Sequence, residues 1–121
     1  MIEFKNVSYA HSKGYGVNSL NMVIDEGDFT FLIGPTGSGK TTLMRLIYFD
    51  ILPDTGLVKV NGNKYTDVSK RKIPNIRKSI GMVFQDFRLL KDRHLFENVA
   101  LPLHVFGYSN REIADRVGEA L

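Results

Sequence analysis

The chain has 121 residues, of which 43% are hydrophobic and 24% are charged, and it contains no cysteine. This composition is typical of one globular domain and excludes a disulfide scaffold, cysteine-ligated metal sites and thiol nucleophiles. No apolar run approaches the roughly 18 residues that a membrane-spanning helix needs. The N-terminus lacks the basic and apolar segments of a secretory signal, so we expect a cytoplasmic location.

The net charge of +3 is distributed unevenly along the chain. Residues 59–93 contain ten basic and three acidic side chains, whereas the parts on either side are slightly acidic. Such a stretch can attract the phosphates of nucleic acid or an anionic membrane surface, which would make the protein a non-catalytic binding module. A basic run is more often a solvated surface, so the charge alone does not identify a partner.

The first third of the chain predicts strands separated by turns. Residues 2–9 alternate apolar and polar side chains as a half-buried strand does, and Leu20–Ile24 predicts a second strand antiparallel to it. Residues 12–16 and 25–28 are rich in turn-forming residues. Phe29–Ile33 is a short, nearly all-apolar run, which predicts a strand buried on both faces of an α/β sheet.

Periodicity and turn signals predict two elements in the middle of the chain. From Lys40 onward, the spacing of Leu43, Leu46 and Ile47 predicts a helix of about three turns that ends before Pro53. Residues 56–62 predict a short strand that runs into an Asn-Gly turn, which is a strong hairpin signal.

The last part of the chain predicts a strand between helices. A short helix closes at residues 76–79, Ile80–Phe84 is an apolar strand, and Leu95–Val105 is a helix that Pro102 interrupts. Residues 109–112, Ser-Asn-Arg-Glu, form a capping box that begins a last helix. Because this helix reaches the final residue without a stop signal, we expect the chain to be part of a longer domain.

Residues 34–41, Gly-Pro-Thr-Gly-Ser-Gly-Lys-Thr, match the phosphate-binding motif G-x-x-x-x-G-K-S/T. The motif lies between a predicted strand and a predicted helix, which is the context it requires. Gly37 and Gly39 allow the backbone to curl until successive N–H groups point inward, where a side chain would block phosphates. The helix that follows adds the partial positive charge of its N-terminus. These features predict nucleotide binding.

The side chains of the motif have distinct predicted roles. Lys40 bridges the β- and γ-phosphates, the hydroxyl of Thr41 binds Mg²⁺, and Thr42 reaches the region of the α-phosphate. The predicted cofactors are therefore ATP and Mg²⁺. The predicted nucleotide-contacting residues are Gly34, Pro35, Thr36, Gly37, Ser38, Gly39, Lys40, Thr41 and Thr42.

Hydrolysis also requires a group that organises Mg²⁺ or the attacking water at the end of a neighbouring strand. The candidate strand at residues 80–84 is followed by Gln85 and Asp86. With Asp86 as the carboxylate, the chain would be a compact stand-alone P-loop NTPase. With Gln85 as the functional residue, its amide oxygen would serve the metal or the water from a mobile loop.

The set of features from the opening strand through Gly34–Thr42 to Ile80–Asp86 resembles the nucleotide-binding domain of ABC transporters, an α/β P-loop NTPase fold with an antiparallel β subdomain. More narrowly, Gly81–Arg93 together with Glu97–Leu103 resembles the FtsE subfamily of cell-division ATP-binding proteins. Related lipoprotein-release and macrolide-export ATPases share the glutamine and the Asn-Val-x-Leu-Pro-Leu pattern, and they are the alternative.

The resemblance implies an ATPase in which residues 34–42 are the Walker A loop. Gln85 would be the Q-loop residue, which contacts Mg²⁺ and acts with Lys40 in catalysis, and Asp86–Arg93 would contact an integral membrane partner resembling FtsX. The family further implies a homodimer that lies peripherally on the inner face of the cell membrane. No specific nucleic acid is expected.

Two positions depart from the family pattern. In the family an aromatic residue after the first strand stacks on adenine, and His11 occupies that position here, with Tyr9 two residues earlier on the same strand face. Either ring could stack on the base, and an imidazole, which titrates near neutral pH, predicts a weaker and pH-sensitive affinity. His94 stands where a small hydroxyl residue is usual.

The resemblance also implies that the chain is the N-terminal part of one ABC ATPase domain. We expect residues 1–33 to form the β region and the P-loop strand, 34–50 the Walker A loop and helix, 51–86 the hairpin region up to the Q-loop, and 87–121 the start of a helical subdomain. The Leu-Ser-Gly-Gly-Gln signature, Walker B strand, D-loop and switch histidine of the family are absent from this sequence. We therefore expect weak nucleotide binding, no turnover, and uncovered apolar strand edges in the chain alone.

Overall fold

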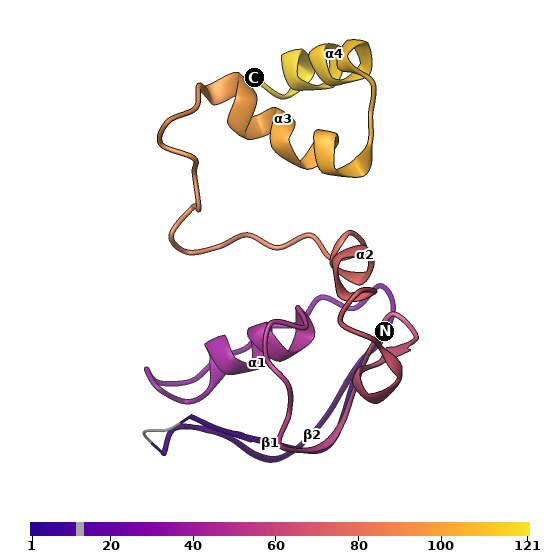
Figure 1. Cartoon of the computed structure of the whole chain (residues 1–121). Helices are drawn as coiled ribbons and strands as arrows, with labels where there is room; N and C mark the ends of the chain where they lie inside the picture. Colours follow the sequence, from indigo (N-terminus) through magenta and orange to yellow (C-terminus); the bar gives the residue numbers. More distant parts are fainter. Residues whose placement is uncertain (12–13) are drawn as a thin grey trace. The chain divides into compact units, whose positions relative to one another are not determined.

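The computed structural model describes residues 1–11 and 14–121, and its contacts divide the chain into two compact units, Met1–Gly81 and Met82–Leu121. The first unit contains a sheet with helices α1 and α2, and the second contains helices α3 and α4 (Figure 1). Each unit has its own hydrophobic cluster. Within the described residues, none of the helices has the length and apolar character to cross a membrane.

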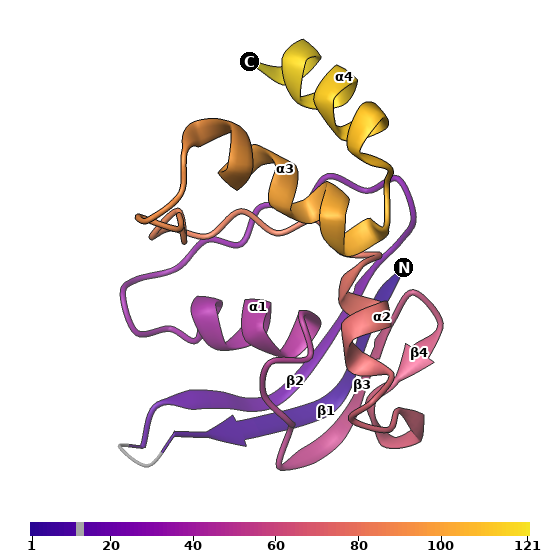
Figure 2. The ribbon, with the colours of Figure 1, turned by 45° about the horizontal axis from the view of Figure 1, so that its top comes forward.

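The sheet of the first unit has the strand order β2-β1-β3-β4, and every neighbouring pair is antiparallel (Figure 2). The two predicted hairpins are therefore confirmed, although Ser12 and Lys13 of the first predicted turn lie outside the described residues. In the second hairpin, Asn61 and Gly62 have φ values of 47° and 81°, as a type I′ turn requires. The strands are β1 (Ile2–Ala10), β2 (Gly16–Ile24), β3 (Thr55–Val60) and β4 (Asn63–Lys64).

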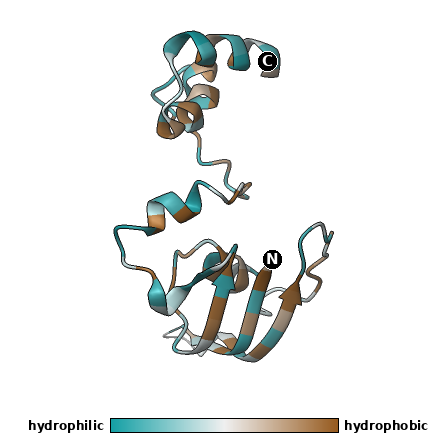
Figure 3. Ribbon diagram, turned by 90° about the vertical axis from the view of Figure 1, so that its right-hand side faces the viewer, coloured by the Kyte–Doolittle hydropathy of each residue, from teal (hydrophilic) through white to brown (hydrophobic). Residues whose placement is uncertain are grey.

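An irregularity in β1 places two large side chains in the core. Hydrophilic and hydrophobic residues alternate along the strands (Figure 3), but Phe4 and Val7, which are three positions apart, are both buried. In a regular strand they would point to opposite faces. The pairing of β1 with β2 shifts register between these two residues, and Asn6 between them has φ 48°. This bulge lets one strand contribute both side chains to the same face.

Helix α1 (Lys40–Ile47) packs through Leu43, Leu46 and Ile47 against the core cluster of the sheet. The predicted length of about three turns is wrong, because the helix has eight residues. It ends where Phe49 adopts φ 57° and buries its ring, which stacks on Tyr65 at a centroid distance of 5.0 Å. Packing of this ring therefore ends the helix earlier than the periodicity indicates.

One side chain of helix α2 (Ile73–Arg77) caps the carbonyl groups at the C-terminal end of α1. The guanidinium of Arg77 donates from Nε to the carbonyl oxygen of Tyr48 at 3.0 Å and from Nη2 to that of Phe49 at 2.9 Å. Carbonyl groups at a helix C-terminus have no partners within the helix. Here the partner is the side chain of Arg77, which comes 28 positions after Phe49 in the chain. The remaining short helix, η1, spans Tyr65–Asp67.

The two predicted apolar strands, Phe29–Ile33 and Ile80–Phe84, are not strands in the structure, so these predictions are wrong. Phe29 is 83% exposed, Ile33 89% and Val83 97%. A strand forms when its backbone N–H and C=O groups bond to a neighbouring strand. None of the strands in the described part of the chain pairs with either segment. Neither apolar run therefore joins the sheet.

The second unit is a pair of helices, α3 (Leu95–Phe106) and α4 (Asn110–Ala120), which meet at Ala100, Ile113 and Val117. The prediction that Pro102 interrupts α3 is wrong, because the helix continues through it. Pro102 removes one N–H from the helical hydrogen bonds. The packing of Ala100 and Leu103 against α4 holds the turns on either side of it together.

Carboxylates cap the N-termini of both helices. Ser109 N donates to Glu112 Oε2 at 2.9 Å and Ser109 Oγ accepts from Glu112 N at 3.4 Å, which confirms the predicted capping box. His94 N donates to Glu97 Oε2 at 2.9 Å at the start of α3. Hydrogen bonds from the backbone of His94 and the side chain of Arg93 lower the pKa of Glu97. Those from the side chain and backbone of Ser109 lower the pKa of Glu112.

We predict that Leu46→Ala lowers the free energy of unfolding by about 2–4 kcal/mol, because it leaves a cavity where a fully buried side chain stood. Met44→Ala is the matched control, since Met44 lies on the same helix and is 43% exposed. It should cost less than about 1 kcal/mol. Urea denaturation followed by circular dichroism measures both. Equal losses for the two variants would contradict the packing of α1 described above.

We also predict that α3 and α4 lose helicity as the pH falls from about 6 to about 3. A carboxylate whose pKa is lower in the folded state stabilises that state above its unfolded pKa, and the contribution disappears as the pH falls through the folded pKa. The double variant Glu97→Gln/Glu112→Gln should have less helix at about pH 6 and a flatter pH profile, because a neutral amide caps more weakly. Ellipticity at about 222 nm follows this change. A double-variant profile parallel to that of the wild type would refute it.

Candidate phosphate-binding site

The glycine-rich loop leads directly into α1, and its glycines are needed where the structure places them. Gly37 and Gly39 have φ values of 83° and 90°, in the left-handed region that favours glycine. A Cβ atom on Gly39 would lie 2.9 Å from the carbonyl oxygen of Gly16 and 3.2 Å from Cγ2 of Val17. The start of β2 therefore lies against the loop, and this contact leaves no room for a side chain at position 39.

The N-terminus of α1 has free hydrogen-bond donors and no compensating negative charge. The helical hydrogen bond from Leu43 N to Gly39 O, at 2.9 Å, leaves the N–H groups of residues 40–42 without acceptors within the helix. This helix lies wholly within the described residues, and neither a side-chain cap nor an acidic residue occupies its first turn. The positive end of its dipole therefore faces the loop, where an anion can bind.

Lys40 lies over the start of the loop. Its Nζ atom donates to the carbonyl oxygens of Gly34 and Pro35, at 2.7 Å each, and lies 3.4 Å from Ser38 Oγ. A bond from an ammonium group to a phosphate oxygen carries opposite charges and is stronger than these bonds to neutral carbonyls. Lys40 is therefore held in the loop by contacts that a phosphate group can replace.

Thr41 and Thr42 differ in environment. Thr41 is exposed, so its hydroxyl is accessible to a metal ion, whereas Thr42 is 5% exposed and its Oγ1 lies 3.2 Å from Nε2 of His11. The ring of His11 in turn meets that of Tyr9 edge-on, with centroids 4.9 Å apart. The structure therefore joins the two predicted base-stacking residues to the phosphate loop. No local sequence pattern predicts the contact between His11 and Thr42, which are 31 residues apart.

The donor set of the loop suits the polyphosphate of ATP with Mg²⁺. The loop and the first turn of α1 contribute backbone N–H groups, the ammonium of Lys40 and two threonine hydroxyls, and residues 34–42 include no carboxylate. Mg²⁺ keeps several water ligands and is usually bound through substrate phosphates and one or two protein oxygens. One hydroxyl from Thr41, beside phosphate oxygens, fits that pattern.

Gln85 and Asp86 belong to the second unit and lie outside its helices. Both are exposed, and the carboxylate of Asp86 lies 3.6 Å from Nε of Arg88. The predicted roles of Gln85 at the metal and of Asp86 in the alternative NTPase both remain predictions.

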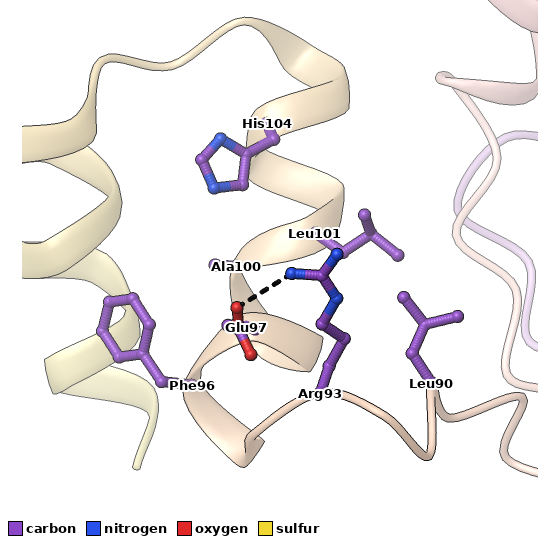
Figure 4. Close-up of a pocket in the computed structure, with 7 residues that line it drawn as sticks. All are labelled: Leu90, Arg93, Phe96, Glu97, Ala100, Leu101 and His104. Carbon is purple, nitrogen blue, oxygen red and sulfur yellow. Dashed lines mark hydrogen bonds and ion pairs between the residues drawn. The ribbon is translucent and has the colours of Figure 1, made fainter.

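A groove of about 320 Å³ lies on the second unit along α3 and the loop before it (Figure 4). Arg93 Nη1 donates to Glu97 Oε1 at 3.2 Å, and this ion pair stands among mainly apolar side chains. The groove combines a hydrophobic lining with one paired charge, as surfaces that bind another protein do. Its lining residues are Leu90, Arg93, Phe96, Glu97, Ala100, Leu101 and His104.

The chain is similar to known ATP-binding proteins. Residues 17–121 match the family model described as ABC transporter. The whole chain is 38% identical over 122 residues to the cell division ATP-binding protein FtsE of Bacillus subtilis (strain 168), of which it covers 54%. It is also 38% identical to FtsE of Escherichia coli (strain K12), covering 55% of it, and 42% identical over 113 residues to FtsE of Mycobacterium tuberculosis, covering 49%. The chain thus spans about half the length of the curated relatives it matches.

Solved structures show the same fold. The ATP-binding cassette MJ0796, in a dimeric post-hydrolysis state bound to ADP and Pi, has a TM-score of 0.88 and 35% identity, covering 98% of this chain and 55% of its own. The protein cbiO1 of Clostridium perfringens, part of the ABC transporter complex cbiONQ, has a TM-score of 0.80 and 28% identity, covering 99% of this chain and 48% of its own. The predicted fold class, an ABC-type P-loop NTPase with an antiparallel β subdomain, is confirmed. The chain belongs to the ABC transporter family.

Proposed function

We propose that this chain provides the Walker A site of an FtsE-like ATPase, which binds Mg-ATP and couples its hydrolysis to a membrane partner in bacterial cell division. The observation that carries the proposal is the uncapped N-terminus of α1, with Lys40 folded over the loop that precedes it. The relatives named as cell division ATP-binding proteins support the biological setting, and the solved cassette with ADP and Pi supports the reaction.

The loop would act mainly by positioning and by charge. The N–H groups at the start of α1 hold the phosphates, and Lys40 leaves the carbonyls of Gly34 and Pro35 to neutralise charge on the β- and γ-phosphates. Thr41 offers its hydroxyl to Mg²⁺, which when bound neutralises charge that develops between these phosphates. Gln85 would complete the metal site and orient the attacking water. Lys40 and Gln85 are thus the proposed catalytic residues.

Turnover is proposed for the whole ATPase, acting as a homodimer. The dimeric cassette bound to ADP and Pi supports this arrangement. For the 121 residues we propose weak binding of Mg-ATP without hydrolysis, because the signature and Walker B motifs of the family are absent from them. The site for the base would be formed by His11 or Tyr9, whose rings are in contact beside the loop.

The groove on α3 is the proposed contact for an integral membrane partner resembling FtsX. Leu90, Phe96 and Leu101 line the groove and are between 42% and 45% exposed, so their burial by a partner would be favourable. The neighbouring loop, residues 86–93, would extend the same contact. A protein bound in this way would lie peripherally on the inner face of the membrane.

We predict that Lys40→Ala abolishes detectable binding of Mg-ATP to the chain, because it removes the ammonium that the phosphates would bind. Lys72→Ala is the matched control: it removes the same charge from the basic stretch and should leave the affinity unchanged. Titration followed by amide NMR signals measures both, even for a weak complex. If Lys72→Ala weakens binding and Lys40→Ala does not, the chain is a basic binding module, and its affinity should then fall steeply with salt.

We predict that Leu101→Asp prevents binding of the membrane partner while nucleotide binding persists, because it replaces an apolar contact surface in the groove with a charge that must be desolvated. Val105→Asp is the control, since Val105 is 56% exposed on the same helix and does not line the groove. Pull-down of a co-expressed FtsX-like membrane protein provides the measurement. Equal retention of the partner by both variants would refute docking at this groove.

A further inference from the structure

His11 reaches from the end of β1 to the first turn of α1, where it contacts a buried hydroxyl. Its Nε2 atom lies 3.2 Å from Oγ1 of Thr42. Thr42, which is 5% exposed, is the one buried polar side chain in the described part of the chain. A buried hydroxyl is unfavourable unless it is hydrogen-bonded. His11 thus satisfies a polar group at the N-terminus of the helix that would hold the phosphates.

The imidazole is held in this orientation from two sides. The ring of Tyr9 meets it edge-on, with centroids 4.9 Å apart and planes inclined by 84°. Its backbone is fixed as well, because His11 N donates to Tyr15 O at 2.6 Å and its carbonyl accepts from Gly14 N at 2.9 Å. The ring therefore points with its Nε2 edge toward α1.

The chemistry of the hydroxyl gives this contact a consequence for a ligand. A threonine hydroxyl has one hydrogen to donate and two lone pairs to accept. When Nε2 of His11 carries a proton and donates it to Thr42 Oγ1, the hydroxyl hydrogen is free to turn toward a phosphate oxygen. The hydroxyl belongs to the first turn of α1, where the N–H groups of residues 40–42 have no acceptors within the helix, so it would add a donor to the same anion site.

We propose that His11 is a positioning residue for the polyphosphate of the nucleotide, which acts by orienting the hydroxyl of Thr42. This inference rests on the proposed nucleotide binding and adds to it a role other than stacking on the base. It follows that a ligand without a base, inorganic tripolyphosphate, depends on His11 as strongly as ATP does.

The test compares Mg-ATP and Mg-tripolyphosphate on the 121-residue chain by NMR titration. His11→Phe keeps a flat ring that can stack on a base but removes the hydrogen bond to Thr42. It should therefore lower the affinity for each of the two ligands about five-fold, which corresponds to the loss of one neutral hydrogen bond. His11→Gln keeps a donor and should restore most of the affinity. Thr66→Val, which removes an exposed hydroxyl on η1, is the control for Thr42→Val and should change neither affinity.

Non-additivity provides the second readout. Because His11 acts through Thr42, His11→Phe should add no further loss to Thr42→Val, whereas independent contacts would add their effects. This comparison, together with rescue by His11→Gln, separates positioning of the hydroxyl from a general loss of structure. If His11→Phe does not fold, Thr42→Val and His11→Gln still carry the test with both ligands.

The outcomes that would contradict the positioning role of His11 differ from the outcome that would contradict nucleotide binding itself. If His11→Phe weakens ATP alone, or changes neither ligand, the positioning role is overturned while the proposed nucleotide binding stands. Full additivity with Thr42→Val overturns it too. If the wild-type chain binds neither ATP nor tripolyphosphate, the proposed function itself fails, and the role of His11 fails with it.

Discussion

The phosphate site depends on the packing of α1 against the antiparallel sheet. Leu43, Leu46 and Ile47 bury one face of this short helix in the cluster that contains Phe4 and Val7. An isolated helix of eight residues is unstable in water, so this burial is what keeps it formed. The free N–H groups at its start, and the loop that leads into them, are therefore held in place by contacts along the buried face of the same helix.

The first hairpin makes a second set of contacts with the helix, close to the loop. The start of β2 lies so close to Gly39 that a Cβ atom there would meet Gly16 and Val17, and the end of β1 reaches Thr42 through His11. The residues proposed to bind the base and those proposed to bind the phosphates are therefore in contact with each other. Changes at Tyr9 or His11 can reach the phosphate loop without any direct contact with a phosphate.

The second unit has a much smaller hydrophobic core than the first. Its two helices share a small cluster centred on Ala100, Ile113 and Val117, and charged caps stabilise their N-termini. Large apolar side chains of α3 remain exposed around its groove. A unit with a small core and an open apolar surface suits a contact with another protein, whereas the first unit packs α1 into a larger core beneath the phosphate loop.

Features encoded within a few residues could be predicted from the sequence. The Asn61-Gly62 turn, the capping box at Ser109 and the curled loop around Gly37 follow from local backbone preferences, and the structure contains all three. The strands predicted at Phe29–Ile33 and Ile80–Phe84 did not form, because a strand needs backbone partners from elsewhere and apolar character does not supply them. Only the tertiary structure decided where α1 ends and that His11 meets Thr42, because both depend on packing between segments that are far apart in the chain.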